Sequence, residues 1–116
     1  MSMDIESLRV ALRDFAAERD WDQFHSPKNL ATALAVEAAE ILEHFQWLTE
    51  EQSRSLPEAK RTEAAEELAD VLLYLVRLAD KLDIDLMSAA TAKLSKNAEK
   101  YPVAKSKGKS TKYTEL

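Results

Sequence analysis

The chain contains no cysteine, a single glycine and only two histidines among its 116 residues. Without cysteine, the protein can form no disulfide, no thiolate metal site and no cysteine nucleophile. One glycine argues against an all-β fold, because tight β-turns need glycine. No apolar run reaches the roughly 18 residues of a membrane span, and the N-terminus lacks the pattern of a signal peptide. We therefore expect a soluble, cytoplasmic protein with no membrane partner.

The residue types that are abundant favour helix. Eighteen Ala and sixteen Leu stand against eight Val and Ile together, and this bias is typical of all-α proteins. The chain is 46% hydrophobic and 32% charged, a mix that indicates one globular domain rather than a disordered chain.

Charge is distributed unevenly along the chain. The net charge of −5 disfavours a binder of nucleic acid polymers, which would normally be basic. Residues 1–92 carry 9 Lys and Arg against 19 Asp and Glu, whereas residues 93–116 carry 7 Lys against 2 Glu. An acidic body with a basic tail could bind a metal at one end of a ligand and phosphate at the other. The alternative is that the tail is simply solvated.

Capping residues and hydrophobic periodicity predict four helices. The first spans about residues 4–19, and residues 20–25 form a connection. Ser26 followed by Pro27 predicts the start of the second helix, which continues to residue 45 or 46. Residues 49–52 fit a capping box that can start a single turn.

The third predicted helix spans residues 57–82, and the fourth begins at the cap Asp85 and ends before Pro102, which disfavours helical geometry in the preceding residue. Apolar residues of the third helix cover roughly 220° of its circumference, about twice what a surface helix needs. This excess predicts burial against a second subunit and hence a homo-oligomer. We expect a helical domain over residues 1–102 and a flexible basic tail over residues 103–116.

Two pairs of carboxylates stand out on the second and third helices. Glu37 and Glu40 are three residues apart, and Glu37 lies on the apolar stripe of its helix. Glu67 and Asp70 repeat the spacing among other acidic residues of the third helix. Unpartnered carboxylates are costly to bury, so a divalent cation bound by oxygen ligands, Mg²⁺ or Mn²⁺, would explain both pairs. The alternative is two solvated faces with incidental spacing.

Other metal chemistry fits the sequence less well. Di-iron bundles use Glu-x-x-His pairs, and neither His25 nor His44 lies three residues after a Glu. His44 follows Glu40 by four residues, which leaves a mixed site open. Zinc is disfavoured because cysteine and paired histidines are lacking, and the chain has no D-x-D-x-D-G calcium loop.

Residues suited to a nucleotide accompany the carboxylates. Four aromatic residues could stack on a base, although each could equally belong to the core: Trp21, Phe24, Trp47 and Tyr74. Lys93, Asn97 and Lys100 share one face of the fourth helix, where they could meet phosphate oxygens or simply face solvent.

Together these residues resemble the dCTP pyrophosphatases of the all-α MazG-like nucleotide pyrophosphohydrolase superfamily. The resemblance covers nearly the whole chain. It includes the run from Phe15 to Trp21, Gln23-Phe24-His25, the E-x-x-E of Glu37 and Glu40, Phe45-Gln46-Trp47, the E-x-x-D of Glu67 and Asp70, and the closing Lys112-Tyr113-Thr114. In one departure, Leu12 aligns with a histidine that contacts the nucleotide in close relatives, at a position that bears on base or sugar selectivity.

The resemblance implies a Mg²⁺-dependent enzyme of nucleotide-pool sanitation, with Mn²⁺ as an alternative cofactor. Its substrate would be a deoxynucleoside triphosphate, dCTP or a modified dCTP, cleaved to the monophosphate and pyrophosphate. The implied metal ligands are Glu37, Glu40, Glu67 and Asp70, with Glu37 or Glu40 also acting in catalysis. The implied substrate-binding residues are Trp21, Asp22, Gln23, Phe24, His25, Trp47, Tyr74, Lys93 and Asn97.

The resemblance also implies a homodimer or homotetramer, in which the tail orders over a neighbouring subunit's site. A competing hypothesis is a non-enzymatic helical module for assembly or regulation, since an apolar third helix would serve interaction equally well.

Overall fold

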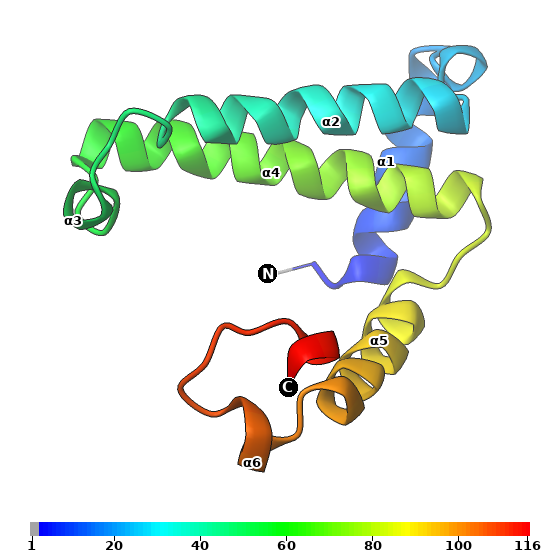
Figure 1. Ribbon diagram of the computed structural model, residues 1–116. Helices are drawn as coiled ribbons and strands as arrows, with labels where there is room; N and C mark the ends of the chain where they lie inside the picture. Colours follow the sequence, from blue (N-terminus) through cyan, green and yellow to red (C-terminus); the bar gives the residue numbers. More distant parts are fainter. Residues whose placement is uncertain (1–2) are drawn as a thin grey trace. The chain divides into compact units, whose positions relative to one another are not determined.

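The computed structural model describes residues 3–116, and the regular structure in this range is entirely helical, as the sequence predicts (Figure 1). The elements in chain order are α1 (Ile5–Glu18), η1 (Asp22–Phe24), α2 (Pro27–Glu43), α3 (Glu50–Ser53), α4 (Glu58–Lys81), α5 (Leu86–Lys100), α6 (Val103–Ser106) and η2 (Tyr113–Glu115). They group into two compact units, one ending at Ile84 and the other beginning at Asp85. None of the described helices combines the length and apolar character needed to cross a bilayer.

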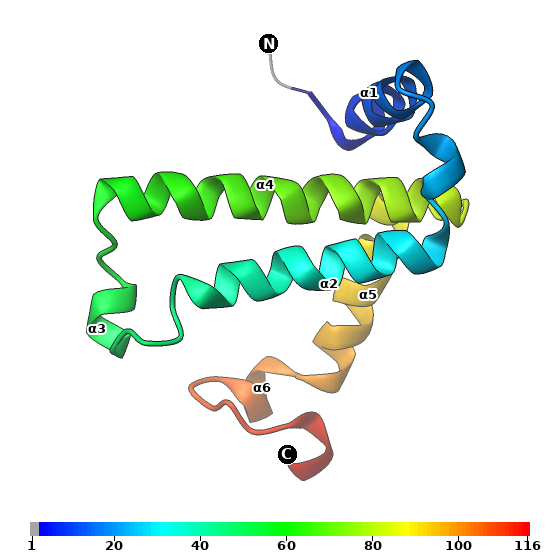
Figure 2. The same cartoon turned by 90° about the horizontal axis from the view of Figure 1, so that it is seen from above.

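In the first unit, α2 and α4 run antiparallel and lie side by side, and α1 packs against α4 (Figure 2). The short α3 lies in the connection between α2 and α4. This arrangement places the carboxylate pairs of the second and third predicted helices on facing elements, which is what the metal hypothesis requires.

Side-chain hydrogen bonds cap four helices and confirm the starts predicted at Ser26, Thr49 and Asp85, whereas α4 begins after Pro57 without a side-chain cap. The side chain of Asp4 accepts from the backbone N–H of Ser7 at 2.7 Å. Ser26 caps α2 in the same way, and Asp85 caps α5. Thr49 forms the expected capping box at α3. Each cap satisfies an N–H that the first helical turn leaves without a partner.

Two aspartates end α1 and α4 where glycine is more usual. Asp20 and Asp83 have φ of 54° and 55°, in the left-handed region that Asp tolerates better than most residues. The next backbone N–H of each connection turns back onto its helix, from Trp21 to the Ala16 carbonyl and from Ile84 to the Ala79 carbonyl. The chain thus stops both helices without glycine.

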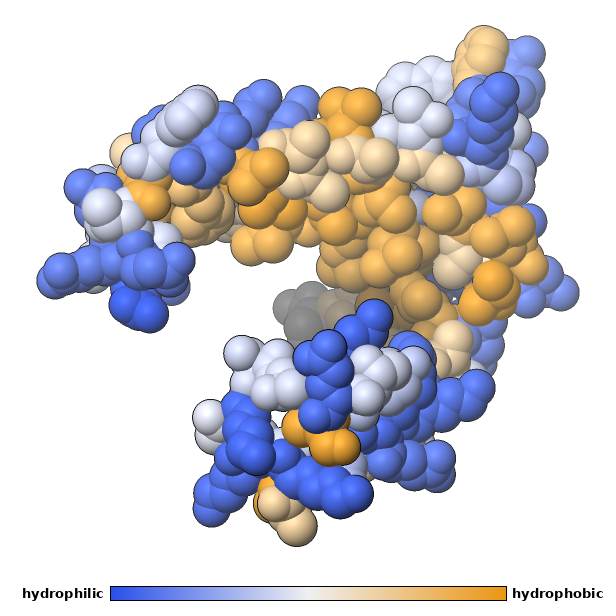
Figure 3. Space-filling view, in the orientation of Figure 1, coloured by the Kyte–Doolittle hydropathy of each residue, from blue (hydrophilic) through white to orange (hydrophobic). Residues whose placement is uncertain are grey.

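The apolar core of the first unit is small. Its two largest fully buried side chains are Leu30 of α2 and Val76 of α4, each 2% exposed. Many large apolar side chains of the same helices are exposed instead: Val36, Leu42, Leu68, Leu72 and Leu75. Figure 3 shows hydrophobic residues gathered over the paired helices α2 and α4. One side of α4 is therefore packed within the chain, whereas burial of another side against a second subunit stays a prediction.

The second unit contains α5 and the basic tail. Tyr101 and Tyr113 meet edge to face, with ring centroids 5.9 Å apart, and Lys100 Nζ lies 4.7 Å from the Tyr113 ring. The tail thus contains short helical turns and an aromatic contact that composition alone did not predict. The division between the units falls before α5, and the domain boundary expected after Pro102 stays a prediction.

Candidate metal centre and aromatic pocket

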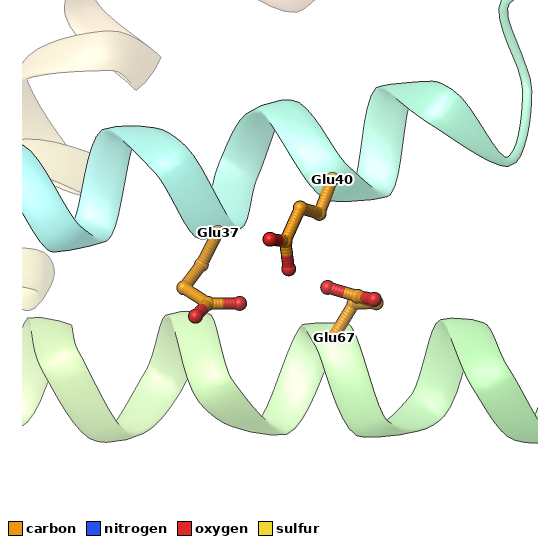
Figure 4. A group of neighbouring side chains, drawn as sticks. All are labelled: Glu37, Glu40 and Glu67. Carbon is orange, nitrogen blue, oxygen red and sulfur yellow. The ribbon is translucent and has the colours of Figure 1, made fainter.

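Three of the four predicted metal ligands converge between α2 and α4. Carboxylate oxygens of Glu37, Glu40 and Glu67 all lie within 4.8 Å of one another. Glu37 and Glu40 extend from α2 towards α4, and Glu67 extends from α4 towards α2 (Figure 4). The three-residue spacing puts both α2 carboxylates on the same side of their helix, and the antiparallel packing brings Glu67 opposite them.

Two of the three carboxylates have a buried oxygen atom without a hydrogen-bond partner in the described part of the chain, as expected of a cation site. Glu37 Oε2 and Glu67 Oε2 are buried and, among the described residues, have no hydrogen-bond partner. Buried polar atoms are normally paired, and like charges this close repel one another. A divalent cation would satisfy both conditions, and a set of carboxylate oxygens suits a hard ion. The residues present therefore fit a metal.

The pKa values of two of these groups reflect the crowding. Contact with the Glu40 carboxyl, then burial, and then the charges of Glu40, Asp70 and Glu67 raise the pKa of Glu37 above its usual range. Contact with Glu40 also raises the pKa of Glu67, followed by burial and the Glu40 charge, whereas His44 opposes this rise. In the absence of a cation, Glu37 and Glu67 therefore retain their protons to a higher pH than an ordinary glutamate does.

His44 lies at the edge of the carboxylate group. Its Nε2 is 3.7 Å from Glu67 Oε1, and its Nδ1 is 3.9 Å from Glu63 Oε2. These separations allow ion pairing when the imidazole is protonated. The spacing of Glu40 and His44 left open a metal site with both carboxylate and histidine ligands. In the structure, His44 lies outside the group of three carboxylates and is close to one of them, Glu67.

Asp70, the fourth predicted ligand, is not part of the three-carboxylate group. Its charge helps to raise the pKa of Glu37, and its side chain lines a separate pocket beside α1. Its role as a metal ligand stays a prediction. Asp70 therefore belongs to the pocket lining, while its charge still acts on Glu37.

That pocket is a cavity of about 150 Å³ between α1, the Trp21–His25 connection and α4. It is lined by Leu12, Phe15, Trp21, His25, Asp70, Leu73, Tyr74 and Arg77. The volume is below the roughly 300 Å³ at which pockets for whole ligands begin, so the cavity can accept part of a ligand. The structure thus brings together three of the predicted substrate-binding residues, Trp21, His25 and Tyr74.

The other predicted substrate-binding residues lie elsewhere. Asp22 accepts hydrogen bonds from Arg77 and Lys81, and Gln23 donates to Asp20, so both serve the connection itself. Phe24 is exposed, and Trp47 is 86% exposed in the connection after α2. Lys93 and Asn97 belong to α5 of the second unit.

Arg77 is a charged residue of the pocket lining to which the sequence analysis assigned no role. It is 4% exposed on α4, and its guanidinium group contacts three residues of the first unit: His25, Asp22 and Asp80. The signal in the sequence is an arginine at a position flanked by apolar residues, Val76 and Leu78. A charged residue inside an apolar arc needs partners, and two of them, His25 and Asp22, lie far away in sequence.

Comparisons with known proteins place these features in a family context. A model of the MazG-like family matches residues 32–116. The mouse protein dCTP pyrophosphatase 1 is 46% identical over 114 residues, which cover 97% of this chain and 67% of the mouse protein. The human dCTP pyrophosphatase 1 is 45% identical over the same shares of the two chains. A crystal structure of a pyrophosphatase from Archaeoglobus fulgidus superposes with a TM-score of 0.80 at 40% identity, covering 88% of this chain and 95% of that one.

Proposed function

We propose that this chain, which belongs to the MazG-like family, hydrolyses dCTP to dCMP and pyrophosphate with a bound divalent cation. The observation that carries the proposal is the cluster of three carboxylates formed by Glu37, Glu40 and Glu67. Relatives named dCTP pyrophosphatase that match 97% of the chain support a nucleotide pyrophosphohydrolase. Removal of dCTP or modified dCTP from the nucleotide pool is the physiological role we infer.

The proposed metal ligands are Glu37, Glu40 and Glu67, with Asp70 completing the set. When bound, Mg²⁺ or Mn²⁺ would offset the charge of the substrate phosphates and lower the pKa of a nearby water molecule. The carboxylates supply hard oxygen ligands, and their buried, unpaired oxygens are available for this purpose.

In the proposed reaction, water attacks the α-phosphorus and a new P–O bond forms there. The bond from the α-phosphorus to the oxygen that bridges to the β-phosphate breaks, and pyrophosphate leaves with that electron pair. The water's proton goes to a carboxylate of the chain, and Glu37 and Glu40 are the two candidates. Contact with the Glu40 carboxyl raises the pKa of Glu37, and a higher pKa makes a carboxylate a better proton acceptor.

The aromatic pocket is the proposed site of the base. Trp21 and Tyr74 supply aromatic surface there, and His25 supplies a polar group. Asp70 lines the same pocket and follows the proposed ligand Glu67 by three residues in the E-x-x-D motif. We assign Trp47, Lys93 and Asn97 to substrate binding in the assembled enzyme, with the two α5 residues at the phosphates.

The active form we propose is a homodimer or homotetramer. The exposed apolar residues of α2 and α4 described above gather in one region of the surface, and contiguous exposed apolar surface of this kind is typical of protein–protein interaction sites. Burial of this surface between copies would also enlarge a core that is small for a chain of this length.

A panel of deoxynucleoside and ribonucleoside triphosphates with Mg²⁺ tests the proposal. We expect dCTP, or a cytosine-modified form, to have the highest kcat/KM, with pyrophosphate and dCMP as the primary products. EDTA should abolish turnover, and Mg²⁺ or Mn²⁺ should restore it. Orthophosphate as the primary product would mean cleavage at the γ-phosphate and would refute the reaction as written.

A further inference from the structure

Arg77 makes a hydrogen bond that determines the protonation of His25. Its Nε–H donates to His25 Nδ1 at 3.1 Å. A guanidinium group has five N–H donors, no acceptor, and stays charged at all relevant pH values. The contact therefore exists only when Nδ1 is unprotonated, and a neutral imidazole with a free Nδ1 carries its proton on Nε2.

The rest of the Arg77 guanidinium is fixed by two carboxylates. Its Nη2 donates to Asp22 Oδ1 at 2.7 Å and its Nη1 to Asp80 Oδ2 at 3.3 Å. With the side chain 4% exposed, all three sides of the planar group are held within the first unit. A bidentate or tridentate guanidinium of this kind is a rigid reference point for its neighbours.

The charged groups around His25 favour the neutral ring. Burial, and then the positive charges of Arg77 and Lys81 on α4, lower the pKa of His25, while Asp22 in the connection opposes them. From α1, the pocket receives only Leu12 and Phe15. Asp70 of α4 lines the same pocket, whereas the arginines of α1 are engaged with Asp80.

His25 lines the aromatic pocket with one nitrogen engaged by Arg77 and the other free of hydrogen bonds to the described residues. We propose that Arg77 is a positioning residue for the nucleotide: it keeps His25 neutral with Nδ1 as acceptor and thereby presents Nε2–H as a fixed donor to an acceptor atom of the base. That the acceptor belongs to a nucleotide base rests on the function proposed above, whereas the protonation state of His25 does not depend on that function.

The chemistry of the pocket matches such a donor. Apart from His25, Asp70 and Arg77, its walls are apolar or aromatic, so the Nε2–H of His25 lies among surfaces that suit the flat face of a heterocycle. Cytosine offers a carbonyl oxygen and an unprotonated ring nitrogen as acceptors. A donor fixed before binding avoids the cost of selecting a tautomer when the base enters.

Nitrogen NMR on the full-length, isotope-labelled protein measures the state of His25 directly. Long-range proton–nitrogen correlation spectra distinguish the two neutral tautomers, and the His25→Gln variant assigns the signals, because the only other histidine is His44. We expect the wild-type His25 to be protonated on Nε2 at neutral pH and to resist further protonation to a lower pH than a free histidine. Protonation on Nδ1 would overturn the proposal, and this outcome needs no measurement of activity.

The matched variants are Arg77→Met and Lys81→Met. Arg77→Met removes the donor to His25 Nδ1. Asp22 still accepts a hydrogen bond from Lys81, and Asp80 still accepts hydrogen bonds from Arg9 and Arg13. Lys81→Met removes the second cation at Asp22 but leaves the Arg77–His25 contact. We expect mixed tautomers only in Arg77→Met, with KM for dCTP raised roughly threefold to tenfold and a smaller change in kcat.

Equal tautomer changes in both variants would indicate general loosening and would refute a specific role for Arg77. An unchanged KM in Arg77→Met, with its tautomers mixed, would refute the link to the nucleotide. If dCTP proves not to be a substrate while wild-type His25 carries its proton on Nε2, the proposed function fails and the assignment of Arg77 to His25 stands. Should Arg77→Met fail to fold, the wild-type spectrum still decides that assignment.

Discussion

Arg13 on α1 donates two hydrogen bonds to the Asp80 carboxylate on α4, from Nε at 3.1 Å and from Nη2 at 2.6 Å. Arg9 adds a third at 3.0 Å, and Arg77 adds one from α4 itself. Asp80 is thus the centre of a cluster that ties α1 to α4. Because α1 carries Leu12 and Phe15 of the aromatic pocket, this cluster also fixes one wall of the candidate site.

Neutralising Asp80 should destabilise the fold. Asp80→Asn leaves three arginines without their shared charge, and we expect the free energy of unfolding to fall by roughly 2 kcal/mol, since hydrogen bonds to charged groups contribute about 1.5–3 kcal/mol. Urea denaturation measures the change. Asp14→Asn, at an exposed position of α1, is the control and should shift stability by less than about 0.5 kcal/mol. Equal effects of the two substitutions would contradict the assignment.

The same carboxylate predicts how stability responds to acid. Hydrogen bonds from Arg13, and then from Arg9, lower the pKa of Asp80 despite its burial. A carboxyl whose folded pKa is depressed contributes stability above its unfolded pKa of about 3.9 and loses that contribution as pH falls through the folded value. The stability difference between wild type and Asp80→Asn should therefore be constant from pH 7 to 5 and shrink below about pH 4. A difference that grows in acid would exclude this linkage.

Neutralising one member of the carboxylate group should separate catalysis from stability. Glu40→Gln removes a proposed ligand and a repelling charge, so we expect turnover to fall at least a hundredfold while the melting temperature without metal stays level or rises. The upward shift of the melting temperature with Mg²⁺ should disappear, because ligand-linked stabilisation needs the site.

Glu43→Gln is the matched control on the same helix, at an exposed position outside the group. It should retain wild-type turnover and the wild-type response to Mg²⁺. Normal activity in Glu40→Gln, measured beside this control, would show that Glu40 does not hold the metal.

Trp47 offers a test of substrate binding with little structural cost. Its side chain is 86% exposed, so Trp47→Ala should leave the stability of a single chain almost unchanged. If the indole stacks on the base in the assembled enzyme, KM for dCTP should rise about tenfold, given that base–aromatic stacking contributes about 1–3 kcal/mol. A Michaelis–Menten analysis at saturating Mg²⁺ measures this, and an unchanged KM would remove Trp47 from the binding residues.

The sequence predicted those features that depend on residues close together in the chain. The caps Ser26, Thr49 and Asp85 are local signals, and each begins a helix as expected. The three-residue spacing of Glu37 and Glu40 is also local, and it gave the correct side of α2 for the carboxylates. Their meeting with Glu67 required only that α2 and α4 pack antiparallel.

Features that depend on distant partners could not be predicted in this way. Arg77 and Asp22 are 55 positions apart, and no spacing rule connects an arginine on one helix with an aspartate in a connection. The apolar arc of α4 likewise indicated two buried sides, but Leu68, Leu72 and Leu75 remain exposed in the single chain. Periodicity shows which faces avoid water without showing what covers them.

The left-handed Asp20 that ends α1 has a consequence for how this site can change. Trp21 follows directly after Asp20 and His25 comes four residues later, so the point at which α1 ends sets the direction in which the connection leaves. One inserted residue would rotate that exit by about 100° and advance it by about 1.5 Å, carrying the indole out of register with Tyr74. The length of α1 thus determines where Trp21 and His25 lie relative to Tyr74. Substitutions at exposed positions of α1 leave this placement unchanged, whereas insertions and deletions within the helix alter it.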